Sequence, residues 1–357
     1  MTSLYQRSIE TLTRYQYPSG AFPASPNFAP YQYSWFRDGA FISYALDSAG
    51  YPEKSELFHR WCANTVLRHS EKILNGINPR NQKGKQSGDG YFHCRFTEDG
   101  DEVPGHWGSH QLDGLGTWLW SLEQHLNSCR QSTLCADYHQ PIDLIADYLL
   151  RLWNNPCSDC WEENESDIHF STLAAVYAGL MAHSRVRKNN RSLEGAQNIR
   201  RFVHEKARAT GYLAKSLNNP DVDASLLWAG LPYEIVDLDS SVFKGTLERI
   251  EQKLLSPGGG VHRYPSDSYY GGGEWLLLAA WYGWVKLRMG DMKVARNQLG
   301  WLEKQTDQEG NLPEQVNKNL IDKNSYRPWV QKWGRSANPL LWSHAMYIIL
   351  NNEIGTG

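Results

Sequence analysis

The sequence of 357 residues lacks the features that mark exported, membrane-bound and nucleic-acid-binding proteins. Its amino terminus has no apolar run like that of a signal peptide, and no stretch reaches the roughly 18 apolar residues of a membrane-spanning helix. The formal net charge of -3 offers no basic surface to nucleic acid or anionic lipid. We therefore expect a cytoplasmic protein that binds a small, neutral partner and neither nucleic acid nor membranes.

Several catalytic signatures are also missing. The sequence contains no P-loop, no G-x-S-x-G elbow, no H-E-x-x-H motif and no dinucleotide-binding fingerprint. These absences disfavour the chemistries that depend on those motifs, and we expect no cofactor.

Cysteine is scarce, with six residues in the chain. Four of them, Cys129, Cys135, Cys157 and Cys160, would suit a zinc site if they came together. A helix predicted over 139–154 separates the two pairs, however, and at about 1.5 Å per residue it would hold them roughly 20 Å apart. We therefore expect no metal at these cysteines, which leaves free buried thiols or a local disulfide bridge.

Aromatic residues are plentiful, with 15 Trp and 19 Tyr. Flat, amphipathic rings are the surfaces on which sugars stack, but they also fill helical cores. Most of the Trp residues are expected in the core. Those that bind a ligand can be recognised only by where they lie along the chain.

Helical periodicity recurs from end to end, and no strand pattern competes with it. The segment at 139–154 carries an apolar stripe on one side, whereas 275–285 is apolar all round and must be surrounded by protein. Twelve helices are predicted, over residues 3–16, 36–50, 52–71, 109–129, 139–154, 169–187, 191–210, 222–230, 241–254, 273–289, 291–305 and 337–352.

The connections between these helices alternate between short and long. Short ones, such as those around residues 50 and 290, place Gly at the end of one helix and Pro or Asp at the start of the next. If the helices run alternately up and down, all the long loops meet on one face, which predicts an (α/α)6 barrel of six helical hairpins. The long loops are expected near residues 17–35, 72–108, 155–168, 256–272 and 306–336.

Two of these loops carry carboxylates beside features that suit acid and base chemistry. In Trp161-Glu162-Glu163, charge repulsion between the neighbouring carboxylates and desolvation by the indole would both raise a carboxyl pKa. Glu314 lies in the last long loop, on the same predicted face. Taken singly, each motif is better explained as an ordinary surface acid.

The other three loops supply groups that suit sugar hydroxyls. Arg37 and Asp38 close the first loop as an adjacent donor and acceptor. Trp107 lies between small residues at the end of the second loop, and Arg263 stands among aromatics in the fourth. The recurrence of such groups on one face favours a sugar-binding site.

Glycoside hydrolysis needs one carboxyl group to protonate the leaving oxygen and a second to activate water. In inverting enzymes the two lie about 6.5 to 9.5 Å apart, whereas a separation of about 5 Å implies retention through a covalent intermediate. Glutamates on opposite rim loops suit the wider gap, but the sequence does not give the distance.

The ordered motifs resemble glycoside hydrolase family 15, the glucoamylases with their glucodextranase and isomaltose-hydrolysing relatives. The resemblance runs nearly end to end. It is carried by YQYSWFRDGAFISYALDSAGY at 31–51, HWGSHQLDGLG at 106–116, CWEE at 160–163, DASLLW at 223–228, GGVHRYPSDSYYGGGEW at 259–275, LPEQ at 312–315 and ANPLLWSHA at 337–345.

This resemblance implies an inverting, exo-acting α-glucosidase that releases β-glucose from the non-reducing ends of soluble α-1,4- or α-1,6-linked gluco-oligosaccharides. Glu162 would be the general acid and Glu314 the general base, with Glu309 as the alternative base. Tyr31 would contact the attacking water, and Arg37 and Asp38 would hold the terminal glucose. The remaining substrate-binding positions would be Trp35, Trp107, Trp161, Glu163, Arg263 and Trp342.

In a departure from many members of that family, we expect a single catalytic domain over residues 1–357, without an amino-terminal β-sandwich or a starch-binding domain. Other functions remain open on the same barrel. They are a trehalase-type α-glucosidase, a phosphorylase with a phosphate site in place of the base, and a catalytically silent sugar-binding or regulatory protein. The oligomeric state is not predicted.

Overall fold

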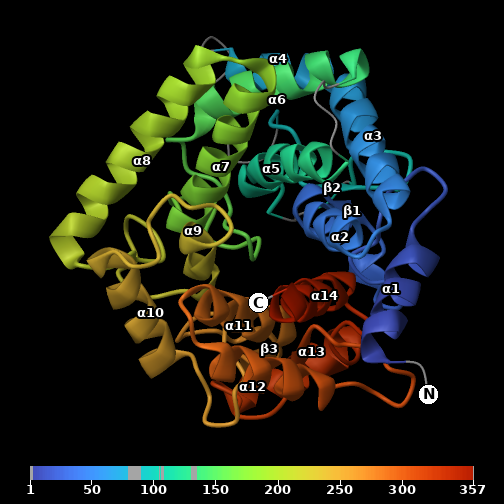
Figure 1. Ribbon diagram of the computed structural model, residues 1–357, viewed down its shortest axis with the longest axis vertical. Helices are drawn as coiled ribbons and strands as arrows, with labels where there is room; N and C mark the ends of the chain where they lie inside the picture. The colour runs from blue at the N-terminus through green and yellow to red at the C-terminus, as the bar shows by residue number, and fades with distance from the viewer. Residues whose placement is uncertain (1–2, 79–89, 104, 106–107, 130–134, 357) are drawn as a thin grey trace.

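Two concentric rings of helices form an (α/α)6 barrel in the computed structural model, which describes residues 3–78, 90–103, 105, 108–129 and 135–356 (Figure 1). The predicted all-α barrel is confirmed. The inner ring comprises α2 (Phe36–Ser48), α5 (Asp113–Ser128), α7 (Phe170–Arg187), α9 (Leu227–Gly230), α11 (Leu276–Arg288) and α14 (Leu341–Thr356). The outer ring comprises α1 (Leu4–Tyr15), α3 (Pro52–Arg68), α6 (His139–Leu152), α8 (Asn190–Thr210), α10 (Ser241–Lys253) and α12 (Met292–Glu303).

The two rings differ in how their helices are buried. In α11 every residue from Leu276 to Val285 is buried, as its apolar run predicts, while α6 buries one side through Ile142, Ile145 and Leu149. Across the described residues, no helix combines the length and the apolar character needed to span a membrane.

The short connections are built from the residues that the sequence pattern indicates. Gly50 has a φ of 87° where α2 ends, and Pro52 opens α3. Gly290 has a φ of 90° where α11 ends, and the Asp291 side chain accepts a hydrogen bond from the Val294 amide at 3.1 Å to cap α12. Each short connection leads from an inner helix to the next outer one, so the longer loops share the opposite face.

Neighbouring inner helices α5 and α7 approach closely at two glycines. A Cβ atom placed on Gly116 would lie 2.3 Å from the carbonyl oxygen of Ala175, and one on Gly179 would lie 2.6 Å from the Cα of Gly116. Side chains at either position would push the helices apart. This part of the ring therefore depends on glycine.

All twelve predicted helices are present, but the structure adds detail that the periodicity did not predict. Helix α13 (Lys323–Trp333) lies within a predicted long loop, and α4 (Ser70–Ile77) begins in the last residues of the predicted helix at 52–71 and extends into the predicted long loop that follows. The predicted helix at 222–230 is shorter: a 3-10 turn, η3 (Ala224–Leu226), precedes the four residues of α9. Residues 211–223, between α8 and η3, form a sixth long loop on the same face as the other five.

Short antiparallel ladders tie these loops together. Strand β1 (Ser34–Trp35) pairs with β2 (Arg95–Phe96), which joins the first and second long loops. Strand β3 (Glu274–Trp275) pairs with β4 (Gln315–Val316), which joins the loop before α11 to the loop before α14. The second ladder begins directly after Glu314 and so limits where that carboxylate can lie.

Candidate active site

A cavity of about 320 Å³ lies among the long loops and the first turns of the inner helices. Its wall contains all but one of the predicted site residues. The exception is Trp107, which lies outside the described residues. The predicted residues that line the cavity are Tyr31, Trp35, Arg37, Asp38, Trp161, Glu162, Glu163, Arg263, Glu314 and Trp342.

The loop that carries Glu162 is wound around the buried carboxylate of Asp159. Asp159 Oδ1 accepts hydrogen bonds from the amides of Trp161 and Glu163, at 2.9 and 3.0 Å. Its carbonyl oxygen accepts another from the Glu162 amide at 2.9 Å. This turn holds Glu162 at a φ of 68°, a left-handed conformation that costs a residue with a side chain about 1 to 2 kcal/mol.

Gly108 leaves room for that strained turn. A Cβ atom at Gly108 would lie 2.6 Å from the Glu162 carbonyl oxygen and 2.7 Å from Ser158 Oγ. The small residue that follows Trp107 in the sequence thus serves the backbone of the acidic loop, rather than only making room for a ligand.

At the start of α2, Arg37 joins three carboxylates and an amide. Its Nη1 donates to Gln111 Oε1 and Asp113 Oδ2, both at 3.0 Å, and its Nη2 lies 3.5 Å from Asp38 Oδ2 and 3.7 Å from Glu162 Oε1. Burial raises the pKa of Asp38 to about 6, against the lowering effect of Arg37. The guanidinium thus links the Arg-Asp pair electrostatically to Glu162.

Several polar atoms of this pair and of its aromatic neighbours have no hydrogen-bond partner within the described protein. Within the described part of the chain, Arg37 Nε, Asp38 Oδ2 and the indole nitrogens of Trp35 and Trp342 are buried without a hydrogen-bond partner. Unsatisfied buried donors and acceptors are costly, and the four residues that carry these atoms all line the cavity. Trp342 itself is fixed by stacking on Phe41, with ring centroids 5.6 Å apart.

Glu314 is enclosed by protein and has only 1% of its surface exposed. Burial raises its pKa to about 7, against the lowering effects of Arg263, Tyr31 and Gln315. Tyr31 is oriented by a 2.9 Å hydrogen bond between its hydroxyl and that of Tyr269. A buried carboxylate of raised pKa beside a tyrosine hydroxyl suits a base that acts on water.

The alternative base, Glu309, does not share this environment. It is exposed, does not line the cavity, and its Oε2 accepts a hydrogen bond from Asn311 at 3.3 Å. The cavity therefore favours Glu314 over Glu309.

Arg263 is held within a ring of aromatic side chains. Its guanidinium carbon lies between 5.1 and 5.2 Å from the ring centroids of Trp161, Tyr264, Tyr269 and Trp275. Its conformation is fixed by a bidentate ion pair with Asp267 and by a contact of 3.3 Å between Nη2 and Glu163 Oε1. The hydroxyl of Tyr264 also donates to Glu163. Glu163 is therefore anchored by its partners rather than free to act as an acid.

A buried ion cluster supports the acidic loop from the sixth long loop, which the sequence analysis did not predict. Lys215 Nζ lies 2.7 Å from Asp223 Oδ2 and 3.4 Å from Asp159 Oδ2. Asp223 in turn accepts from the Trp161 indole nitrogen at 3.0 Å and caps η3. The signal in the sequence was the DASLLW motif that contains Asp223. Lys215 had none, because an isolated lysine in a polar loop is ordinary.

The cavity wall also contains aromatic and basic residues that the sequence analysis did not assign. Tyr269 and Trp275 belong to a quoted motif, but Trp329 and Lys332 come from α13, where no helix was predicted. Trp329 packs edge-on against Tyr269, with ring centroids 4.9 Å apart. These residues extend the aromatic wall beyond the carboxylates.

The cysteines form no disulfide bridges among the described residues. All six are unpaired thiols in the described residues, and Cys157 and Cys160 are buried. Burial raises the pKa of both thiols, which keeps them protonated and inert.

Known proteins share this chain's sequence and its architecture. An isomaltose glucohydrolase from Kribbella flavida is 36% identical over 99% of this chain and 92% of its own length. A glycosidase solved in complex with glucose superposes with a TM-score of 0.93 at 35% identity, covering 99% of this chain and 96% of that one. A bacterial glucoamylase complexed with acarbose shares the fold, with a TM-score of 0.74, 21% identity, and coverage of 99% of this chain and 56% of that one.

The family model described as glycosyl hydrolases family 15 matches residues 1–352. Together with the glycosidase relatives, this match shows that the chain belongs to glycoside hydrolase family 15 and is a glycoside hydrolase.

Proposed function

We propose that this enzyme is an inverting, exo-acting α-glucosidase that releases β-glucose from the non-reducing ends of soluble α-gluco-oligosaccharides. The observation that carries the proposal is that Glu162, Glu314 and the Arg37-Asp38 pair line one cavity. Two carboxyl groups in different environments, beside a hydroxyl-binding pair, are the parts that hydrolysis of a terminal sugar requires.

In this proposal Glu162 is the general acid. Its protonated carboxyl group gives a proton to the glycosidic oxygen as the bond to the anomeric carbon breaks. Glu314, as carboxylate, takes a proton from a water molecule that attacks the anomeric carbon from the opposite face. The water oxygen becomes the new hydroxyl group, and the configuration at the anomeric carbon is inverted.

Arg37 and Asp38 would make the enzyme exo-acting. Both are buried, and together they offer a forked donor and an acceptor to neighbouring hydroxyls of one glucose unit. A sugar chain cannot continue through a pocket end that such residues close, so only a terminal unit fits there.

Isomaltose is the first substrate to test, because the relative from Kribbella flavida is an isomaltose glucohydrolase. Maltose and trehalose represent the other linkages that the cavity leaves open. We expect glucose release from isomaltose to be the fastest of the three. Faster release from trehalose would replace the proposal with the trehalase alternative, and no release from any α-glucoside would contradict an α-glucosidase.

Variants test the two catalytic assignments. Glu162→Gln and Glu314→Gln should each lower kcat about 10²- to 10⁴-fold while the far-ultraviolet circular dichroism is unchanged, because a glutamine keeps the shape but transfers no proton. Glu309→Gln is the matched control and should stay within about twofold of the unmodified enzyme. An active Glu314→Gln with an inactive Glu309→Gln would reverse the base assignment.

A further inference from the structure

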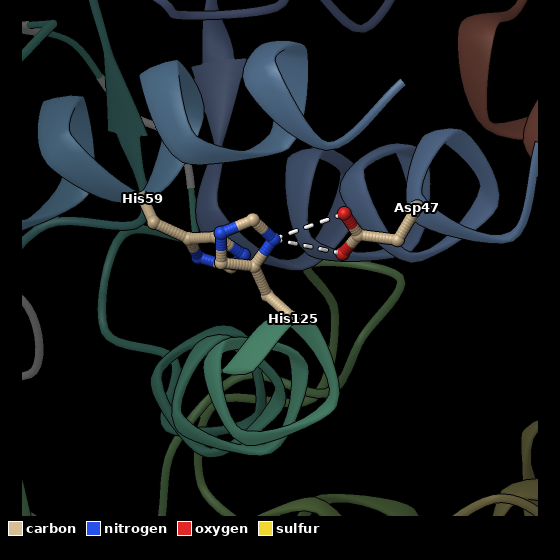
Figure 2. A group of neighbouring side chains, drawn as sticks. All are labelled: Asp47, His59 and His125. Atoms are coloured by element: carbon tan, nitrogen blue, oxygen red, sulfur yellow. Dashed lines mark hydrogen bonds and ion pairs between the residues drawn. The ribbon is translucent and has the colours of Figure 1, made fainter. Parts of the chain in front are cut away.

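A cluster of buried polar side chains lies at the other end of α2 from the cavity. Asp47 is in the last turn of α2, His59 is in α3, and His125 is in the last turn of α5 (Figure 2). Arg37 is ten residues before Asp47, a distance of about 15 Å along the helix axis. The cluster is therefore separate from the proposed catalytic residues, on the face of the short connections.

His59 is the residue in this cluster that the protein alone does not explain. It is completely buried, and neither of its ring nitrogens has a hydrogen-bond partner among the described residues. Its ring lies beside that of His125, with centroids 5.1 Å apart. Leaving a buried polar group without a partner costs about 1 to 3 kcal/mol, so an additional ligand at this position would remove a real penalty.

His125 is arranged as a metal-binding histidine usually is, with Glu56 as its orienting partner. His125 Nδ1 lies 2.9 and 3.2 Å from the two carboxylate oxygens of Asp47, and its Nε2 lies 3.2 Å from Glu56 Oε2. Histidines that bind a metal through one ring nitrogen commonly donate the other N–H to a carboxylate, as His125 does to Glu56. Glu56 is itself held by Arg60 and Tyr138.

The distances suit a small divalent cation. One ligand atom each from Asp47, His59 and His125 lies within 4.8 Å of the other two. Ligands about 2.0 to 2.1 Å from a tetrahedral zinc ion are about 3.3 Å from each other, so binding requires His59 to move inward by a modest amount. Cys129 Sγ lies 3.9 Å from both ring nitrogens of His125 but does not belong to this group of ligand atoms.

We propose that Asp47, His59 and His125 form a structural zinc site that joins α2, α3 and α5. Imidazole and carboxylate ligands favour zinc over calcium or magnesium, which prefer all-oxygen sites. The ion replaces the proton between His125 Nδ1 and Asp47 and supplies the partner that His59 lacks. The site stabilises the barrel and takes no part in hydrolysis, so this proposal stands independently of the proposed function.

Zinc binding by the full-length protein tests this inference. Protein stripped with a chelator and titrated with Zn²⁺ should bind about one equivalent, and its melting temperature should rise by several degrees. His59→Ala and Asp47→Asn should each weaken zinc binding at least tenfold and abolish the rise. The second variant keeps the side-chain shape, so it remains informative if the first unfolds.

The matched control is His183→Ala. His183 is also buried, but both of its ring nitrogens have partners, Ser192 Oγ at 2.8 Å and Asp143 Oδ1 at 2.9 Å. This variant should lose stability yet keep its equivalent of zinc. Absence of stoichiometric binding to the stripped protein, or unchanged binding by His59→Ala and Asp47→Asn, would overturn the proposal.

Discussion

At the scale of single residues, burial determines the pKa of Glu314. Its pKa is raised to about 7, because enclosure in protein disfavours the charged form more than Arg263, Tyr31 and Gln315 favour it. A general base has to be ionised in the free enzyme. The value of kcat/KM should therefore fall about tenfold per unit as the pH drops below about 7, well above the range of an ordinary glutamate.

Tyr31 provides a direct check on that assignment. A hydrogen bond between the Tyr31 hydroxyl and the Glu314 carboxylate lowers the pKa of Glu314. Because Tyr31→Phe removes this bond, it should move the acidic limb of the kcat/KM profile to higher pH. Tyr44→Phe, at the other end of α2, is the control and should leave that limb in place. A limb that does not move in Tyr31→Phe would mean that another group controls it.

Lys215 does not line the cavity, but its loss should destabilise the fold. It is buried with Asp223 and Asp159, so Lys215→Met leaves two carboxylates without their cation. Breaking a buried ion pair in this way costs about 3 to 5 kcal/mol in the free energy of unfolding. Urea denaturation of Lys215→Met and of the unmodified protein measures this loss in the free energy of unfolding. The control, Lys253→Met, removes an exposed pair with Asp221 and should cost less than about 1 kcal/mol.

At the scale of elements, α13 brings Trp329 and Lys332 to the cavity wall. In the proposed function they would contact the sugar beyond the cleaved bond. Stacking on an aromatic ring is worth about 1 kcal/mol, so Trp329→Ala should raise KM for isomaltose severalfold to tenfold and change kcat little. Steady-state kinetics separate the two constants.

Trp333 offers the matched control on the same helix. It is 42% exposed and does not line the cavity. Trp333→Ala should therefore leave KM unchanged, and an equal effect of both substitutions would mean that α13 acts through its folding rather than through contact with the sugar.

The same helix shows where sequence reasoning stopped. Tyr326, Trp329, Val330 and Trp333 follow the spacing of one helix face, but Pro328 lies within the segment, and proline is disfavoured inside helices. The sixth long loop was missed for a different reason. Its polar residues 211–223 lack the aromatic and acidic grouping that marked the other loops, and the helix expected at 222–230 shortened it.

At the scale of the whole molecule, the barrel was predictable because its helices are long, periodic and separated by Gly, Pro and Asp at fixed places. That order also placed Glu162 and Glu314 on one face. The detailed environments were not predictable. The burial that raises the pKa of Glu314 comes from packing, and Asp47, His59 and His125 are separated by up to 78 residues along the chain.

Inversion at the anomeric carbon is the central claim of the proposed mechanism, and proton NMR during the first minutes of isomaltose hydrolysis tests it most directly. If Glu314 activates water against a sugar held by Arg37 and Asp38, β-glucose must appear first and mutarotate to the equilibrium mixture afterwards. Initial release of α-glucose would contradict inversion, because it would require a covalent intermediate on one of the two carboxylates.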